Sequence, residues 1–129
     1  MKTVLSVLVL GLIGQAALAK QVSIDCRPPV GLAGNAATIK GKLNISNGTT
    51  DDGYHVASGK LAILVGGSTA KPVYVNKAVA IQGVILIDNA INAAPVKEGP
   101  LTIVYLNPTR KDLSYVEVDG QMYPSNCVK

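Results

Sequence analysis

The sequence predicts an all-β fold: a single antiparallel β-sandwich of about eight short strands, preceded by a cleaved signal peptide. Short runs rich in Val, Ile and Leu recur along the chain, and several alternate apolar with polar residues, as half-buried strands do. Clusters of Gly, Pro, Asn and Asp separate these runs, as turns require. No convincing amphipathic helix remains after the first 19 residues.

Residues 1–19 have the features of a secretory signal peptide, and residues 20–129 form the single predicted domain. The apolar core Val4–Ile13 is too short to span a bilayer, which makes an uncleaved membrane anchor the less favoured alternative. The small-residue site Ala17-Leu18-Ala19 would leave Lys20 as the first mature residue. We therefore expect a secreted or periplasmic protein with no membrane insertion after signal cleavage.

Charge and composition limit the partners and the core. The formal net charge is +4, and the lysines and arginines are scattered without a dense cluster. A nucleic-acid or membrane-surface function would need a concentrated basic patch, so we expect neither. The chain has no Trp and no Phe, so its core must use aliphatic residues, Ala and some Tyr. A core of that kind is modest at this length.

The only two cysteines, Cys26 and Cys127, lie near the two ends of the predicted domain. An even count behind a secretory signal favours a disulfide, which would place the first and last strands side by side. The alternative is a reactive or metal-binding pair. It is less favoured because neither cysteine has a His or a second Cys nearby in sequence.

The N-terminal half contains three predicted strands. Gln21–Asp25 alternates as an edge strand and leads into Cys26. Apolar and polar residues alternate along Thr38–Ser46, which indicates an antiparallel strand with one solvent-exposed face. After the turn cluster 47–53, the strand Tyr54–Val65 repeats part of the pattern, since Gly-Lys-Leu occurs both at 41–43 and at 59–61.

The longest apolar run of the predicted domain, Val79–Ile87, is predicted to be a central strand because it is apolar on both faces. Gly83 within it indicates a bulge or a close backbone approach. A short strand, Pro72–Val75, precedes it. The region Asp88–Pro100 shows no strand character, and we expect one helical turn at Ala90–Ala94.

Three more strands are predicted near the C-terminus. Leu101–Leu106 is followed by Leu113–Val118 and Gln121–Tyr123, which flank the dipeptide Asp119-Gly120. Such a dipeptide favours a type I′ hairpin turn, where both central residues need positive φ. The number of short strands favours an immunoglobulin-like sandwich over a closed small barrel.

Catalytic patterns in the sequence are weak. His55 is the only histidine, so a Ser–His–acid triad would have to use it, with Asp51 and Asp52 close in sequence. The chain has no G-x-S-x-G motif. Ser68-Thr69-Ala70-Lys71 matches S-x-x-K, but the S-D-N and K-T-G elements that accompany it in serine enzymes are missing, so we interpret it as a chance match.

Metal and cofactor sites are not predicted either. Asn47, Asp51 and Asp52 place oxygen-bearing side chains in one loop, but the regular ligand spacing of an EF-hand is absent. Asn, Asp and Gly are also the residues that any turn prefers. We expect no cofactor and no metal ion, and we name no catalytic residue.

The first hypothesis is therefore a small exported protein without catalysis, a binding or structural module of the cell envelope or extracellular space. It would act on a protein partner through an exposed sheet edge or through the loops 47–53 and 88–100.

An alternative is a secreted inhibitor of a hydrolase such as lysozyme. The stretch Leu101–Asn107, together with Val118–Gln121, resembles hairpins of bacterial lysozyme inhibitors over less than a quarter of the chain. The S-G-A-R-Y-like element of those families is absent, and Ser58-Gly59-Lys60 is a poor substitute for it. A further alternative is a small hydrolase that uses His55.

Overall fold

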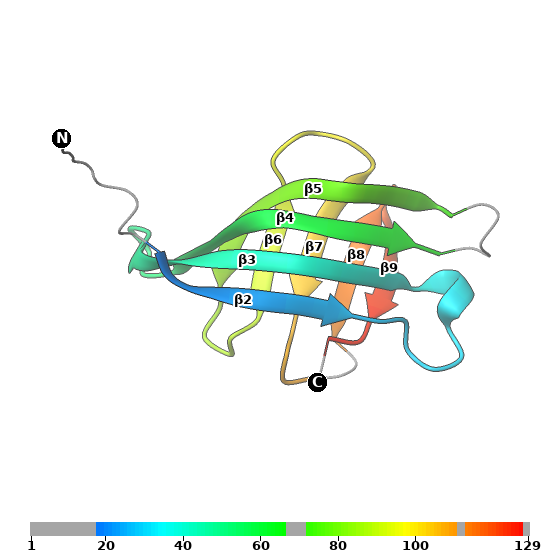
Figure 1. The fold of residues 1–129 in the computed structure, drawn as a ribbon, viewed down its shortest axis with the longest axis horizontal. Coiled ribbons are helices and arrows are strands. Elements are labelled where there is room, and N and C mark those ends of the chain that lie inside the picture. The colour runs from blue at the N-terminus through cyan, green and yellow to red at the C-terminus, as the bar shows by residue number, and fades with distance from the viewer. Residues whose placement is uncertain (1–17, 67–71, 111–112, 128–129) are drawn as a thin grey trace.

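The computed structural model describes residues 18–66, 72–110 and 113–127 and shows an all-β fold (Figure 1). Its described strands are β2 (Leu18–Cys26), β3 (Ala37–Thr49), β4 (His55–Val65), β5 (Tyr74–Ile85), β6 (Ile91–Pro95), β7 (Leu101–Leu106), β8 (Ser114–Val118) and β9 (Gln121–Ser125). A short 3-10 helix, Ala33–Asn35, precedes β3. The predicted signal peptide falls mostly on residues outside those described and stays a prediction. In the described ranges, no helix is long and apolar enough to cross a bilayer.

All eight strands form one antiparallel sheet, in which each strand pairs with the next along the chain. The sheet curls into a half-barrel: β2 to β5 form the front layer in Figure 1, and β6 to β9 lie behind and cross it steeply. The two-sheet, immunoglobulin-like sandwich is not confirmed, because the hydrogen-bonded ladder continues from β5 into β6 without a break. Alternation gives each strand one apolar face in either architecture, so the pattern did not distinguish them.

The core lies on the concave face of this sheet. In β3, Ile39, Leu43 and Ile45 are buried, while Lys40 and Lys42 on the opposite face are exposed. The same alternation in the other strands gives a core of aliphatic residues with one tyrosine. Its largest fully buried side chains are Ile39, Leu43, Leu61, Ile63, Ile81, Leu106, Val65, Val104, Val116 and Val118.

The repeated Gly-Lys-Leu motif forms a symmetric cross-strand contact. Gly41 of β3 lies opposite Leu61 of β4, and Leu43 lies opposite Gly59. A Cβ at either glycine would come within about 3 Å of the opposite leucine side chain, at 2.9 Å for Gly41 and 3.1 Å for Gly59. The backbone oxygen of the lysine before each leucine is closer still, at 2.6 Å for Gly41 and 2.5 Å for Gly59, so both glycines lie where the opposite strand leaves no room for a side chain.

The sheet turns its corner between β5 and β6, where Gly83 lies opposite Ala93. A Cβ on Gly83 would clash with the backbone carbonyl oxygen of Asn92 and with Ala93 itself. This close approach confirms the prediction made for Gly83. The small pair therefore lies where the end of β5 pairs with β6, the first of the strands that cross the front layer steeply in Figure 1.

Three boundaries differ from the sequence-based expectation. The expected helical turn at Ala90–Ala94 is wrong: most of it belongs to β6, whose Ile91 and Ala93 are buried in strand alternation. The segments Pro72–Val75 and Val79–Ile87 contribute to one strand, β5, which is interrupted by a register shift opposite Leu61 and Ile63. The strand also ends before Ile87, which is 97% exposed in the β5–β6 turn.

The C-terminal hairpin forms as predicted. Val118 of β8 lies opposite Gln121 of β9, and the two residues between them have positive φ, 52° at Asp119 and 81° at Gly120. This is the backbone geometry of a type I′ turn.

The predicted disulfide between Cys26 and Cys127 is present and joins residues 101 positions apart. Beside it, Arg27 N–H donates to Asn126 O at 2.9 Å and Asn126 N–H donates to Arg27 O at 2.7 Å. The hydroxyl of Ser125 donates to Ala37 O at 2.6 Å. These contacts therefore join three segments at one corner of the sheet: the end of β2, the start of β3 and the chain at the end of β9.

Substituting Gly83 by Ala should destabilise the fold by about 1–3 kcal/mol, because the added methyl group must displace the backbone of β6. Urea unfolding measures this change. Gly48→Ala is the matched control, since a Cβ there meets nothing within 4 Å, and we expect it to change stability by less than about 0.5 kcal/mol. Equal effects of the two substitutions would contradict the tight corner.

Reducing the disulfide should lower the free energy of unfolding by about 4–5 kcal/mol, the chain-entropy value for a loop of this length. Unfolding curves with and without reductant, with thiol titration to verify reduction, test this value. An unchanged unfolding midpoint in fully reduced protein would show that the bond does not constrain the fold.

Candidate functional site

Within the part of the chain that the structure describes, one edge of β2 has no strand paired along it. β2 is the first described strand of the sheet, and its described ladder is with β3. On its other side, the described residues provide one backbone bridge, between Arg27 and Asn126. In Figure 1 this free edge runs along the lower side of the front layer, towards the C-terminal end of the described chain.

The bridge shows which backbone groups of β2 face the free edge. Both the N–H and the C=O of Arg27 point to Asn126, away from β3. Because successive strand residues direct these groups to opposite sides, those of Gln21, Ser23 and Asp25 also point to the free edge. The backbone N–H and C=O groups of Val22 and Ile24 point instead to β3, where Val22 lies opposite Leu43 and Ile24 lies opposite Gly41.

The other end of the sheet, β9, is less accessible as a pairing edge. By the same alternation, Pro124 directs its backbone away from β8, and it has no N–H to offer. Proline at such a position is a common protection of an edge strand. β2 contains no proline between its first and last residues.

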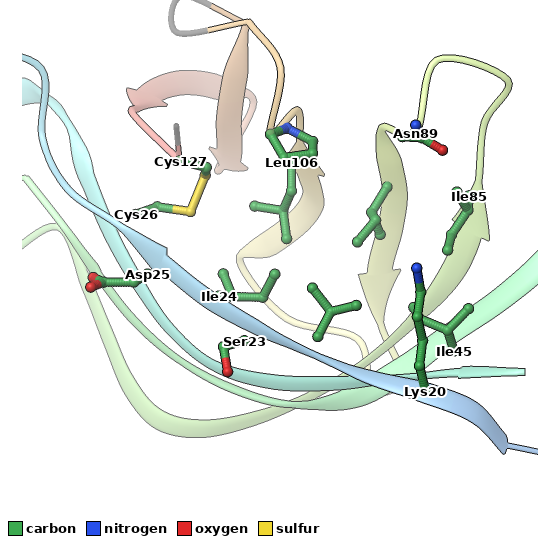
Figure 2. A pocket seen from close by; sticks show the side chains of 13 residues that line it. Lys20, Ser23, Ile24, Asp25, Cys26, Ile45, Ile85, Asn89, Leu106 and Cys127 are labelled. Carbon is green, nitrogen blue, oxygen red and sulfur yellow. A yellow bond between two sulfur atoms is a disulfide. The ribbon is translucent and has the colours of Figure 1, made fainter. Parts of the chain in front are cut away.

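An apolar groove of about 520 Å³ lies on the inner side of β2 (Figure 2). Val22 and Ile24 form one wall and pack against the core as partly buried side chains. The floor and the opposite wall come from β3, β5, β6 and β7, through Ile45, Ile85, Ile91 and Leu106, and from Pro108 in the turn after β7.

The Cys26–Cys127 disulfide lies at one end of the groove, with Leu106 beside it. Pro108 also lines the groove. The turn after β7 is fixed by Asn107, whose Oδ1 accepts from the backbone N–H of Thr109 at 3.1 Å and from its hydroxyl at 2.9 Å. These contacts hold Pro108 in place in the groove wall.

The other end of the groove is polar. Lys20 projects its ammonium group from β2 past Ile45, on the side of the groove where Asn89 and Ile85 lie (Figure 2). Asn89 belongs to the β5–β6 turn and has a left-handed backbone, with φ of 68°. Its N–H donates to Leu86 O at 2.9 Å, which fixes the turn.

The remaining polar residues of β2 contribute little to the groove interior. Figure 2 shows Ser23 and Asp25 directed away from it. Asp25 is also 3.7 Å from the guanidinium of Arg27, in an exposed ion pair. Lys20 is therefore the charged side chain that faces the groove.

A second hollow, of about 610 Å³, lies between β5 and the connection from β6 to β7. Its lining includes Lys60, Lys97 and Glu98 together with small residues such as Ala78 and Ala80. It also adjoins the part of β5 ahead of the pairing with β6, which begins at Ile81. Its charges of both signs give it no clear preference for one ligand class.

His55 does not lie in either hollow. It is exposed, and its Nδ1 is 3.0 Å from the backbone oxygen of Ser46. The hydroxyl of Ser46 is engaged elsewhere, since it accepts from Val56 N–H at 2.9 Å and donates to Gly48 O at 2.7 Å. These contacts give no support to a triad built on His55.

The other sequence candidates are placed as follows. Asn47 is exposed near the end of β3, and Asp51 and Asp52 are exposed in the β3–β4 turn, where Thr50 and Tyr54 bond to each other. Ser68-Thr69-Ala70-Lys71 lies outside the described residues. Among the residues that are described, no group of three His, Cys, Asp or Glu side chains could hold a metal ion.

Sequence reasoning named the cysteines, the β2 edge and the loop that carries Asn89, but it missed the groove. Its lining comes from distant segments, including Lys20, Ile45 and Leu106. The one available signal was the alternation of β2, which already placed Val22 and Ile24 on a common face.

No family model matches the chain, and no curated protein or solved structure is significantly similar to it.

Proposed function

We propose that the chain is a small exported binding module without catalysis, which holds an extended segment of a protein partner at the free edge of β2. The observation that carries this proposal is the row of backbone groups at Gln21, Ser23 and Asp25 that faces no strand in the described part of the chain. An added strand would satisfy these donors and acceptors in the way that β-augmentation does.

The position of β2 supports this use of its edge. The strand is anchored at one end by the disulfide and by the hydrogen bonds between Arg27 and Asn126. Anchoring reduces the entropy that the edge would lose on binding, which favours affinity. The contrast with the proline-protected β9 favours β2 as the pairing strand.

Export is supported by the signal-peptide pattern of residues 1–19 and by the disulfide, which is typical of oxidising compartments.

An inhibitor of a hydrolase such as lysozyme remains one version of the proposal, in which the partner is the enzyme. Ser58-Gly59-Lys60 lies within β4, paired on both sides, so it does not form a protruding inhibitory loop. A hydrolase that uses His55 has no supporting contact at that residue.

Ser23→Pro should abolish partner binding while the fold stays intact. Proline removes an N–H that faces the free edge, and it leaves the bonds from β2 to β3 in place. The test immobilises three disulfide-intact proteins, the wild type, Ser23→Pro and the control Ser23→Ala, and exposes each to envelope and extracellular extracts. We expect the wild type and Ser23→Ala to retain the same partner and Ser23→Pro to lose it.

Hydrogen exchange of the complex then locates the contact. Slower exchange at the amides of residues 21, 23 and 25 would support strand addition. Retention of the same partner by Ser23→Pro would contradict it, because binding would then use another surface. Assembly of the free chain into a regular oligomer, with no partner retained, would indicate a structural function instead.

A further inference from the structure

We infer that the groove behind β2 is a binding site for a single-chain amphiphile with a carboxylate head, such as a fatty acid. The alkyl chain would lie on the apolar floor, and the carboxylate would lie beside the ammonium group of Lys20. This site uses inner-face side chains, whereas strand addition uses the backbone edge of β2, so each proposal stands or fails without the other.

The groove has the size and lining of a small-molecule site. Its volume of about 520 Å³ falls within the range of about 300–1,000 Å³ that is usual for such sites. The floor and walls are formed by the aliphatic side chains of Val22, Ile24, Ile45, Ile85, Ile91 and Leu106. Val22, Ile24 and Ile85 are only partly buried, so covering them with an alkyl chain removes apolar surface from water, at about 25 cal/mol for each Å².

The groove is polar at one end and apolar at the other, which matches the polarity of an amphiphile. At the apolar end, the disulfide and Leu106 would contact the end of the alkyl chain. At the open end, Lys20 and Asn89 offer an ammonium group and an amide (Figure 2). Both can donate hydrogen bonds to a carboxylate.

The charges around the open end favour an anion. Lys20 is exposed, so its ammonium group can meet a head group at the mouth of the groove. Asp25 points away from the groove and pairs with Arg27. Asp88, in the same turn as Asn89, accepts a hydrogen bond from Ala90 N–H at 3.1 Å. Signal cleavage after Ala19, as predicted, would add the α-ammonium group of Lys20 to the same mouth.

Calorimetric titration of the full, disulfide-intact protein with decanoate, decanol and decylamine, each below its micelle concentration, tests this inference. These ligands share one alkyl chain and differ in the charge of the head. We expect decanoate to bind most tightly and decylamine most weakly. Equal affinity for all three would show an apolar groove without a carboxylate site, and no binding of decanoate would overturn the inference altogether.

Charge reversal locates the head group. Lys20→Glu should weaken decanoate binding by about fivefold, the upper range for an exposed ion pair, and should leave decanol binding unchanged. Lys97→Glu is the matched control, since it makes the same change in net charge on the exposed β6–β7 connection. An equal loss in the two variants would mean that only the overall charge matters, and would contradict the placement of the carboxylate.

Ile24→Lys separates the groove from the edge of β2. A charged side chain in the groove wall should abolish binding of both decanoate and decanol, because it would have to be buried with the alkyl chain. Ser23→Pro, in contrast, leaves the inner face unchanged and should retain decanoate binding. Loss of decanoate binding in Ser23→Pro but not in Ile24→Lys would place the ligand at the strand edge and overturn the inference.

Discussion

The covalent bond between Cys26 and Cys127 ties the two ends of the curled sheet together. It joins the end of the first described strand to the chain just beyond the last one, and the paired backbones of Arg27 and Asn126 continue this junction. Because this junction holds the two ends of the sheet together at one corner, the edges beyond it need not be paired with each other. The free edge of β2 and the groove behind it both exist because the half-barrel is closed at this corner and open beyond it.

The two candidate surfaces arise from the two sides of one strand. Alternation sends Val22 and Ile24 to the inner side, where they line the groove. The backbone groups of Gln21, Ser23 and Asp25 point in the plane of the sheet, towards its free edge. A single short strand therefore presents an apolar wall and a row of hydrogen-bonding groups in perpendicular directions, and different molecules can use them.

Local features of the fold were predictable where a few residues determine the backbone. The Asp119-Gly120 turn is an example, because type I′ geometry needs positive φ at two adjacent positions. The close approach at Gly83 is another, since a lone glycine in an apolar strand indicates a neighbour too near for a side chain. The strand β6 was missed because its pattern of small residues around Ile91 and Ala93 is short and precedes a proline.

The amino-acid pattern was enough to predict an all-β chain, strands with one apolar face each, and a disulfide between the two cysteines. These properties follow from side-chain periodicity, turn chemistry and the parity of the cysteines. Only the tertiary structure decided that one sheet folds over itself and that Lys20, Ile45 and Leu106 meet around a groove. Alternation specifies which side of a strand is buried, but the curl of the sheet, which brings β6 to β9 behind β2 to β5, specifies what that side is buried against.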